Sequence, residues 1–217
     1  MAERRIVFVT GGTGYMGQCL IARLVEHGHQ VRALVRAGSE GKLPKGCTAV
    51  VGNALDQTTF ADKIATADAF VQLVGVPHPS PSKGAQFRAI DFVSVRESVA
   101  AAVTARVHHF VYVSVAHPAP MMKDYIAVRT EGEAMIRASG MNATILRPWY
   151  VLGPGHWWPY AVAPFYWICE RLPATREGAQ RLGLVTLQQM VAALLQAVES
   201  PVTGTRVLEV PQIRSGG

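Results

Sequence analysis

A glycine-rich segment near the start of the chain has the residue types and spacing to bind an anion. Gly11, Gly14 and Gly17 recur at three-residue intervals in GGTGYMG, after an apolar stretch and before a helical pattern. Glycine permits a sharp turn and lets backbone N–H groups approach a ligand, and a helix N-terminus adds unpaired N–H groups and partial positive charge. The segment therefore predicts a pyrophosphate site of a dinucleotide. The alternative is a tight turn that serves packing alone.

The elements that must position this turn follow from the alternation of apolar strands with amphipathic helices. We predict strands at residues 5–10, 31–35, 48–51, 69–74, 110–113, 142–146 and 206–210, and helices at 15–27, 58–64, 86–105, 125–138 and 187–198. Neighbouring parallel strands need crossover helices. We therefore expect an α/β, Rossmann-like, doubly wound and mostly parallel sheet. Residues 1–217 would form a single domain, with 153–217 as a small C-terminal region on the substrate side.

Composition excludes several other classes. The 217 residues are 49% hydrophobic, and 21 Lys and Arg against 15 Asp and Glu give a net charge of +6. No dense basic run or basic–aromatic helix face predicts nucleic-acid binding. The three cysteines are widely spaced, so we expect no metal site and no disulfide framework. Without a long apolar run we expect no transmembrane segment, and reduced thiols favour a cytoplasmic protein.

The sequence TGGTGYMG resembles the cofactor loop of the short-chain dehydrogenase/reductase superfamily, in its extended and atypical branches. Later segments agree with that superfamily in the same order: VRALVR (31–36), VVGNALD (50–56), FVYVSV (110–115), TILRPWYVLGPG (144–155) and LVTLQQMVAALLQAV (184–198). The resemblance implies an NAD(P)-binding Rossmann-like protein. It assigns the cofactor loop to Gly11, Thr13, Gly14, Tyr15, Met16 and Gly17.

The end of the second predicted strand favours NADP over NAD. An NAD enzyme usually has Asp or Glu there to bind the ribose 2′-hydroxyl, whereas this chain has Arg36, with Arg32 on the same strand face. A guanidinium can bind a 2′-phosphate that a carboxylate would repel. NAD is the alternative, with Arg36 as a solvated surface residue.

The resemblance also places residues around the adenosine. Asn53, Ala54 and Leu55 would lie beside the adenine, and Val74 and Gly75 would line the adenosine ribose. For Asp56 we favour a helix-cap role over a binding role.

In the superfamily a Tyr-x-x-x-Lys pair on a helix carries the proton transfer. This chain has Tyr125 and, four residues later, Arg129. By resemblance Tyr125 would exchange a proton with the substrate oxygen, Arg129 would steady Tyr125 or the nicotinamide ribose, and Ser114 would help to hold the carbonyl. Arginine is planar and bulkier than lysine, so this exchange is not conservative. The alternative for Tyr125 is a half-buried aromatic residue of an amphipathic helix.

The substrate side is predicted to be aromatic. By resemblance Pro148 lies beside the nicotinamide, with Trp149 and Tyr150 near the substrate. All four tryptophans, including Trp157, fall between residues 149 and 167. Such a cluster could form a pocket wall, a subunit contact or a membrane-surface contact.

We therefore predict an oxidoreductase that transfers hydride between NADP(H) and a small apolar carbonyl, quinone or enone-type acceptor. The alternative is a non-catalytic NADP-binding sensor or structural subunit, which the loss of the usual lysine favours. The partner would be a small apolar or aromatic molecule, and the chain would be a monomer or a homodimer.

Overall fold

Parallel pairing of every strand in the main sheet organises the molecule. The computed structural model describes residues 3–119, 121–153, 178 and 181–216. The main sheet has seven strands in the order β3-β2-β1-β4-β5-β6-β9, and all six neighbouring pairs are parallel. These strands are β1 (Ile6–Thr10), β2 (Gln30–Val35), β3 (Cys47–Val51), β4 (Ala69–Gln72), β5 (His109–Val113), β6 (Ala143–Arg147) and β9 (Thr205–Glu209).

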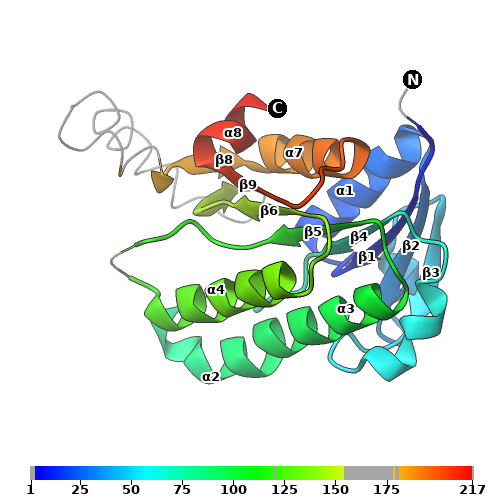
Figure 1. Ribbon diagram of the computed structural model, residues 1–217, viewed down its shortest axis with the longest axis horizontal. Helices are drawn as coiled ribbons and strands as arrows, with labels where there is room; N and C mark the ends of the chain where they lie inside the picture. Colours follow the sequence, from blue (N-terminus) through cyan, green and yellow to red (C-terminus); the bar gives the residue numbers. More distant parts are fainter. Residues whose placement is uncertain (1–2, 120, 154–177, 179–180, 217) are drawn as a thin grey trace.

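Helices cover both faces of the sheet (Figure 1). One face packs on α1 (Tyr15–Glu26), α7 (Leu187–Glu199) and α8 (Val210–Ser215), and the other on α3 (Val93–Thr104) and α4 (Lys123–Ala138). Two apolar cores result. The first contains Leu20 and Leu194, and the second contains Phe8, Phe70 and Phe110, whose rings pack on one another across neighbouring strands. This arrangement confirms the predicted doubly wound α/β fold.

The C-terminal part of the chain contributes a strand to the main sheet and helices to one of its faces. β9 adds the seventh strand, beside β6, and α7 packs on the same sheet face as α1. α7 starts with a capping box in which the Thr186 hydroxyl accepts from the Gln189 N–H and the Gln189 side chain accepts from the Thr186 N–H. A separate two-stranded sheet pairs β7 (Tyr150–Leu152) with β8 (Leu184–Thr186).

Two predicted helices differ from the structure. The segment at 58–64 forms two 3₁₀ turns, η2 (Gln57–Thr59) and η3 (Ala61–Lys63); Asp56 caps η2 by accepting from the Thr58 N–H, which confirms its cap role. The helix expected at 86–105 consists of α2 (Gly84–Gln86), a π-helical turn η5 (Phe87–Phe92) and α3. Two further 3₁₀ turns are η1 (Glu40–Lys42) and η4 (Pro81–Lys83).

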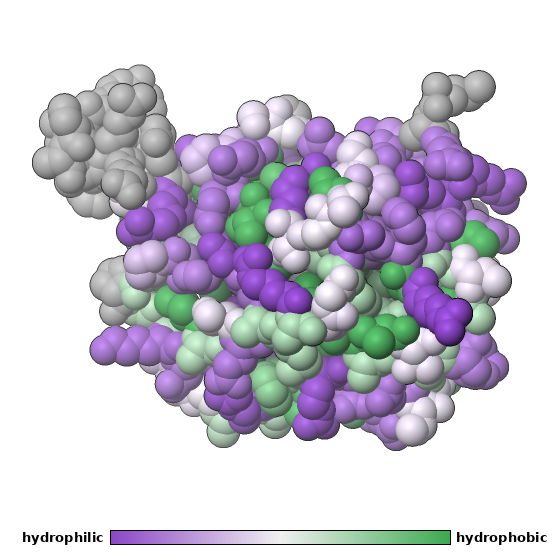
Figure 2. Space-filling view, viewed as in Figure 1, coloured by the Kyte–Doolittle hydropathy of each residue, from purple (hydrophilic) through white to green (hydrophobic). Residues whose placement is uncertain are grey.

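The side of the molecule that carries α3 and α4 has a mixed surface. Figure 2 shows hydrophilic and hydrophobic residues interspersed over it. Arg88 in η5 and Glu131 in α4 form an ion pair there, and both side chains are about half exposed. No helix among the described residues is long and apolar enough to span a membrane.

Candidate dinucleotide site at the carboxyl ends of the strands

The predicted glycine-rich turn lies between β1 and α1, and it depends on glycine. Gly11 has φ +75°, and a Cβ there would lie 2.8 Å from the carbonyl carbon of Leu73. A Cβ at Gly17 would overlap the carbonyl oxygen of Gly11, so the helix packs directly on the turn. Gly14 is the N-cap of α1, and no side chain caps this helix or places an acid in its first turn. The uncapped helix end is suited to an anion.

The sheet order reverses between β1 and β4, next to this turn. At that point the buried side chain of Gln72 accepts from the Thr10 hydroxyl at 2.7 Å and from the Val74 N–H at 2.7 Å, and it donates to the Ser94 hydroxyl. Ligands of open α/β sheets bind in the crevice at such a reversal. Gln72 was not predicted as a site residue, because a polar residue at the end of an apolar strand has no local signature.

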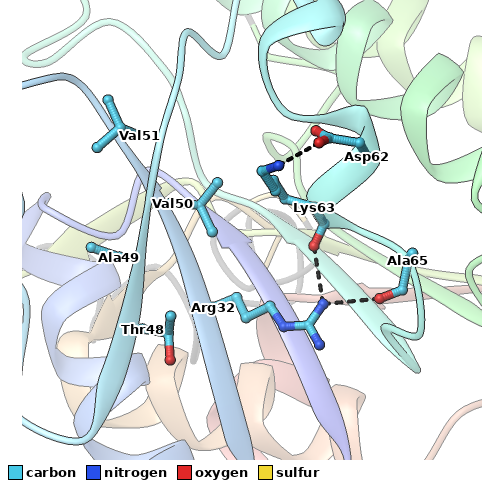
Figure 3. Close-up of a pocket in the computed structure, with 8 residues that line it drawn as sticks. All are labelled: Arg32, Thr48, Ala49, Val50, Val51, Asp62, Lys63 and Ala65. Carbon is cyan, nitrogen blue, oxygen red and sulfur yellow. Dashed lines mark hydrogen bonds and ion pairs between the residues drawn. The ribbon is translucent and has the colours of Figure 1, made fainter.

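Arg32 in β2 and Arg36 just after it have different environments. Arg36, which follows β2, is exposed. The guanidinium of Arg32 donates to the carbonyl oxygens of Lys63 and Ala65 at 3.0 and 2.9 Å (Figure 3). It also donates to the Thr66 hydroxyl. Arg32 therefore anchors the loop after η3, and Arg36 alone remains as the predicted 2′-phosphate ligand.

A surface cavity of about 620 Å³ lies around Arg32 and the outer strand β3. Figure 3 shows the residues that line it. Its other lining residues are Thr48, Ala49, Val50, Val51, Asp62, Lys63 and Ala65. This cavity lies along an edge strand rather than at the carboxyl ends of the central strands. We therefore assign the functional site to the glycine-rich turn and the ends of β4, β5 and β6.

The predicted adenine segment forms a tight turn after β3. Asn53 and Asp56 form an isolated bridge, and the Asn53 side-chain oxygen accepts from the Leu55 N–H at 3.0 Å. Asn53 is exposed, and Ala54 and Leu55 are half-buried. The turn holds these three residues next to one another at the surface.

Tyr125 and Arg129 lie one helical turn apart on α4, as their spacing predicts. The guanidinium carbon of Arg129 is 5.1 Å from the centre of the Tyr125 ring and 5.7 Å from that of Tyr112. Burial raises the pKa of the Tyr125 phenol, and the positive charge of Arg129 opposes this rise. The cation therefore favours the phenolate, which is the form left after proton donation.

Arg129 also has two partners that the sequence analysis did not identify. Its Nη2 contacts the Asp91 carboxylate at 2.5 Å, and its Nη1 donates to the Val113 carbonyl at 2.9 Å. Asp91 is in the π-helical turn, 38 positions before Arg129, and it accepts from the Val76 N–H. Both side chains of this ion pair are almost fully buried.

Ser114 is buried and belongs to a second charged group. Its hydroxyl donates to Glu133 at 2.6 Å, and Arg147 contacts the same carboxylate at 2.5 and 2.9 Å. Arg147 also pairs with Glu209 in β9. Burial raises the pKa of Glu133, but bonds from Arg147 and Ser114 outweigh it and lower the pKa overall. The structure therefore places the Ser114 hydroxyl against Glu133.

Comparisons with known proteins agree with this geometry. A model of the NAD(P)H-binding family matches residues 11–154. The chain belongs to the NAD(P)H-binding family. This result confirms the resemblance to the short-chain dehydrogenase/reductase superfamily, and the matched segment starts at the first glycine of the turn and extends two residues past β7.

Two curated relatives of this NAD(P)H-binding protein are reductases. The chain is 26% identical over 218 residues to a ceramide reductase of Caulobacter vibrioides, covering 99% of this chain and 67% of that protein. It is also 26% identical over 168 residues to 4-hydroxy-2-methyl-3-oxo-4-farnesyl-3,4-dihydroquinoline-1-oxide ketoreductase of Stigmatella aurantiaca. That match covers 67% of this chain and 50% of the ketoreductase. The chain thus spans about two-thirds and one-half of these relatives.

Solved structures share the fold. The Bordetella bronchiseptica enzyme WbmH in complex with NAD⁺ has a TM-score of 0.71 and 22% identity, covering 95% of this chain and 76% of that one. A short-chain dehydrogenase/reductase superfamily protein from Agrobacterium tumefaciens with bound NAD has a TM-score of 0.69 and 20% identity, with coverage of 94% and 77%.

Tyr15, at the start of α1 of the NAD(P)H-binding chain, lies near Tyr125 and Tyr150. Partial burial raises the pKa of the Tyr15 phenol, and nearby Tyr150 and Tyr125 raise it further. Pro148 is buried and its carbonyl accepts from the Ala116 N–H, while Trp149 is half-buried. Trp157 lies outside the described residues.

An apolar pocket of about 400 Å³ adjoins Tyr125. Its walls come from η4, η5 and the start of α4, and its other lining residues are Pro81, Phe87, Met121, Met122, Lys123 and Asp124. The Phe87 ring packs on the Tyr125 ring with centroids 4.9 Å apart. Among the described residues, no group of three or more His, Cys, Asp or Glu side chains could hold a metal ion.

Proposed function

We propose that this NAD(P)H-binding protein is a reductase that uses NADP(H) to reduce the carbonyl of a small apolar ketone, quinone or enone-type acceptor. The observation that carries the proposal is Tyr125 next to the Arg129 guanidinium, beside an apolar pocket formed by the segments that follow β4 and β5. A phenol beside a cation can donate a proton to a developing alkoxide. The proposal is supported by the two relatives named as reductases.

The glycine-rich turn fits the cofactor because neither Gly11 nor Gly17 has room for a Cβ and no side chain caps α1. We propose that the pyrophosphate binds there, and that Arg36 binds a 2′-phosphate. The residues proposed to hold the cofactor are Gly11, Thr13, Gly14, Tyr15, Met16, Gly17, Arg36, Asn53, Ala54, Leu55, Val74, Gly75 and Pro148.

NADPH supplies the hydride when it is bound. The Tyr125 hydroxyl donates its proton to the carbonyl oxygen as the carbon–oxygen π bond breaks, so that one C–H and one O–H bond form. Arg129 stabilises the phenolate that remains until solvent returns a proton. Ser114 can assist as a donor only if its hydroxyl proton turns away from Glu133.

The apolar lining beside Tyr125 favours a substrate with a hydrocarbon or aromatic portion. Met121 and Met122 have flexible side chains that can adapt to such a group. The named substrates of the two relatives, a ceramide and a farnesylated quinoline, carry long hydrocarbon chains, which is consistent with this class. Trp149, Tyr150 and Trp157 remain proposed substrate-side residues.

The second candidate is a non-catalytic NADP-binding sensor or structural subunit. The observation in its favour is that Arg129, at the position of the usual lysine, pairs with Asp91 inside the protein. Stopped-flow measurement of NADPH oxidation with quinones, enones, long-chain ketones and flavins separates the two. Turnover that Tyr125→Phe abolishes supports the reductase. Tight NADPH binding with no turnover of any acceptor supports the sensor.

The choice of coenzyme has its own test. Arg36→Ala is expected to weaken NADPH binding about tenfold or more, because a charge-assisted hydrogen bond to the 2′-phosphate is lost. NADH binding is expected to stay unchanged, because NADH lacks that phosphate. Arg32→Ala is the matched control, because the Arg32 guanidinium already binds the loop after η3. Equal losses for both coenzymes in Arg36→Ala would contradict the NADP assignment.

A further inference from the structure

The Arg129–Asp91 ion pair joins several elements around the proposed proton donor. Arg129 comes from α4, Asp91 from the π-helical turn η5, and Val113 from the end of β5. The second carboxylate oxygen of Asp91 accepts from the Val76 N–H at 3.0 Å, just after β4. Both oxygens of Asp91 are therefore engaged, and each bond fixes a segment of the site.

Gly75 shows how closely this pair is packed. A Cβ at Gly75 would overlap Nη2 of Arg129 and lie 3.1 Å from the Asp91 carboxylate. The chain after β4 therefore runs directly against the ion pair. The π-helical turn brings Asp91 to this point, and π-helical turns often occur at functional sites.

The bonds of Arg129 leave little freedom for its guanidinium. Each terminal nitrogen contacts a protein oxygen, and only 6% of the side chain is exposed. A lysine ammonium at this position is a point charge and lacks the planar fork that reaches Asp91 and Val113 together. Asp91 thus holds the cation at a fixed place beside the Tyr125 ring.

We propose that Asp91 is a positioning residue that acts through Arg129 on Tyr125, and that Arg129 serves Tyr125 rather than the cofactor. This inference rests on the proposed reductase function. It accounts for an arginine at a position where the superfamily usually has lysine: the carboxylate and the carbonyl together select a forked cation.

The test compares Asp91→Asn, Arg129→Gln and the double variant. Both single variants are expected to lower kcat about tenfold or more and to leave the NADPH Kd within about twofold, as expected for groups that act only in the transition state. If Asp91 acts through Arg129, the double variant is no slower than Arg129→Gln alone.

A second measurement does not need turnover. In protein labelled with ¹³Cζ-tyrosine, the Tyr125 resonance is assigned through Tyr125→Phe. It is expected to shift in the same direction in Asp91→Asn and in Arg129→Gln, because both remove the guanidinium from the ring. If Asp91→Asn does not fold, the double variant replaces it, since no buried charge is then left unpaired. The Tyr125 resonance of the double variant is expected at the same chemical shift as in Arg129→Gln alone.

The matched control is Arg88→Gln, which breaks an ion pair between the same two elements, η5 and α4, at the surface. It is expected to change neither kcat nor the Tyr125 resonance. A Tyr125 resonance unchanged by Asp91→Asn, or NADPH binding weakened more than tenfold by Arg129→Gln, would overturn the inference. Failure of the wild type to reduce any acceptor would instead refute the proposed function, and the resonance measurement would still decide the role of Asp91.

Discussion

One face of α4 carries two buried charged groups with opposite arrangements. Tyr125, Arg129 and Glu133 follow at four-residue steps on this face. Arg129 is a cation held by one carboxylate, whereas Glu133 is a carboxylate held by Arg147 and a serine hydroxyl. Burial raises the pKa of Asp91 despite Arg129, while the partners of Glu133 lower its pKa despite burial.

The comparison shows that the balance between burial and the attraction of its partners, rather than burial alone, sets the direction in which the pKa of a buried acid shifts. It also divides α4 into a half beside the pocket, with Tyr125 and Arg129, and a half that connects β5, β6 and β9 through Glu133. We expect the first half to control turnover and the second to control stability.

The largest effect is expected at Tyr125. Tyr125→Phe removes the proposed proton donor and should lower turnover of an accepted ketone or quinone by about 10²–10⁴-fold. Its free energy of unfolding should change by less than about 1 kcal/mol, since only a hydroxyl is lost. Stopped-flow NADPH oxidation and urea denaturation measure the two quantities. A large loss of stability with normal turnover would reverse the assignment of the two halves.

The opposite result is expected for Glu133→Gln. This change leaves Arg147 with a weakened partner and should reduce the free energy of unfolding by ~3 kcal/mol, the range for breaking a buried ion pair. Turnover per folded molecule should stay within about threefold of wild type. Glu131→Gln, an exposed acid on the same helix, is the control. Equal destabilisation by both changes would mean that the buried bonds of Glu133 contribute no more to stability than the exposed ion pair of Glu131.

Acid should reduce the contribution of Glu133 to the free energy of unfolding. The folded-state pKa of Glu133 lies below its ordinary value of 4.5, so the folded state binds fewer protons than the unfolded state near that pH. Its stabilisation is present above pH 4.5 and is lost as the pH falls through the lower folded-state pKa. Urea denaturation at a series of pH values should show a shallower acid loss in Glu133→Gln than in wild type. Parallel curves for the two proteins would refute this linkage.

The smallest effect is expected at Ser114. Ser114→Ala removes one hydrogen bond to Glu133 and should cost about 1 kcal/mol of stability. If Ser114 serves stability through Glu133, turnover per folded molecule stays within about threefold of wild type. A fall of a hundredfold or more in kcat would instead assign Ser114 to the carbonyl, as the family resemblance implies.

Local patterns in the sequence were sufficient for the architecture. The alternation of apolar strands with helices predicted the doubly wound sheet, and GGTGYMG predicted the turn between β1 and α1. The short strands β7 and β8, the helix α8 and the π-helical turn were not predicted. Each is a few residues long and has no repeating apolar pattern, so long-range packing determines it.

The sequence by itself determined where the chain turns, which segments form strands and helices, and that Tyr125 and Arg129 share a helix face, because these features depend on residues close together in the chain. Only the tertiary structure decided the partners of the charged residues. Asp91 meets Arg129 across 38 positions, Arg32 bonds to the loop after η3, and Ser114 donates to Glu133. A buried charge or hydroxyl needs a partner, but nothing in local spacing specifies which distant residue provides it.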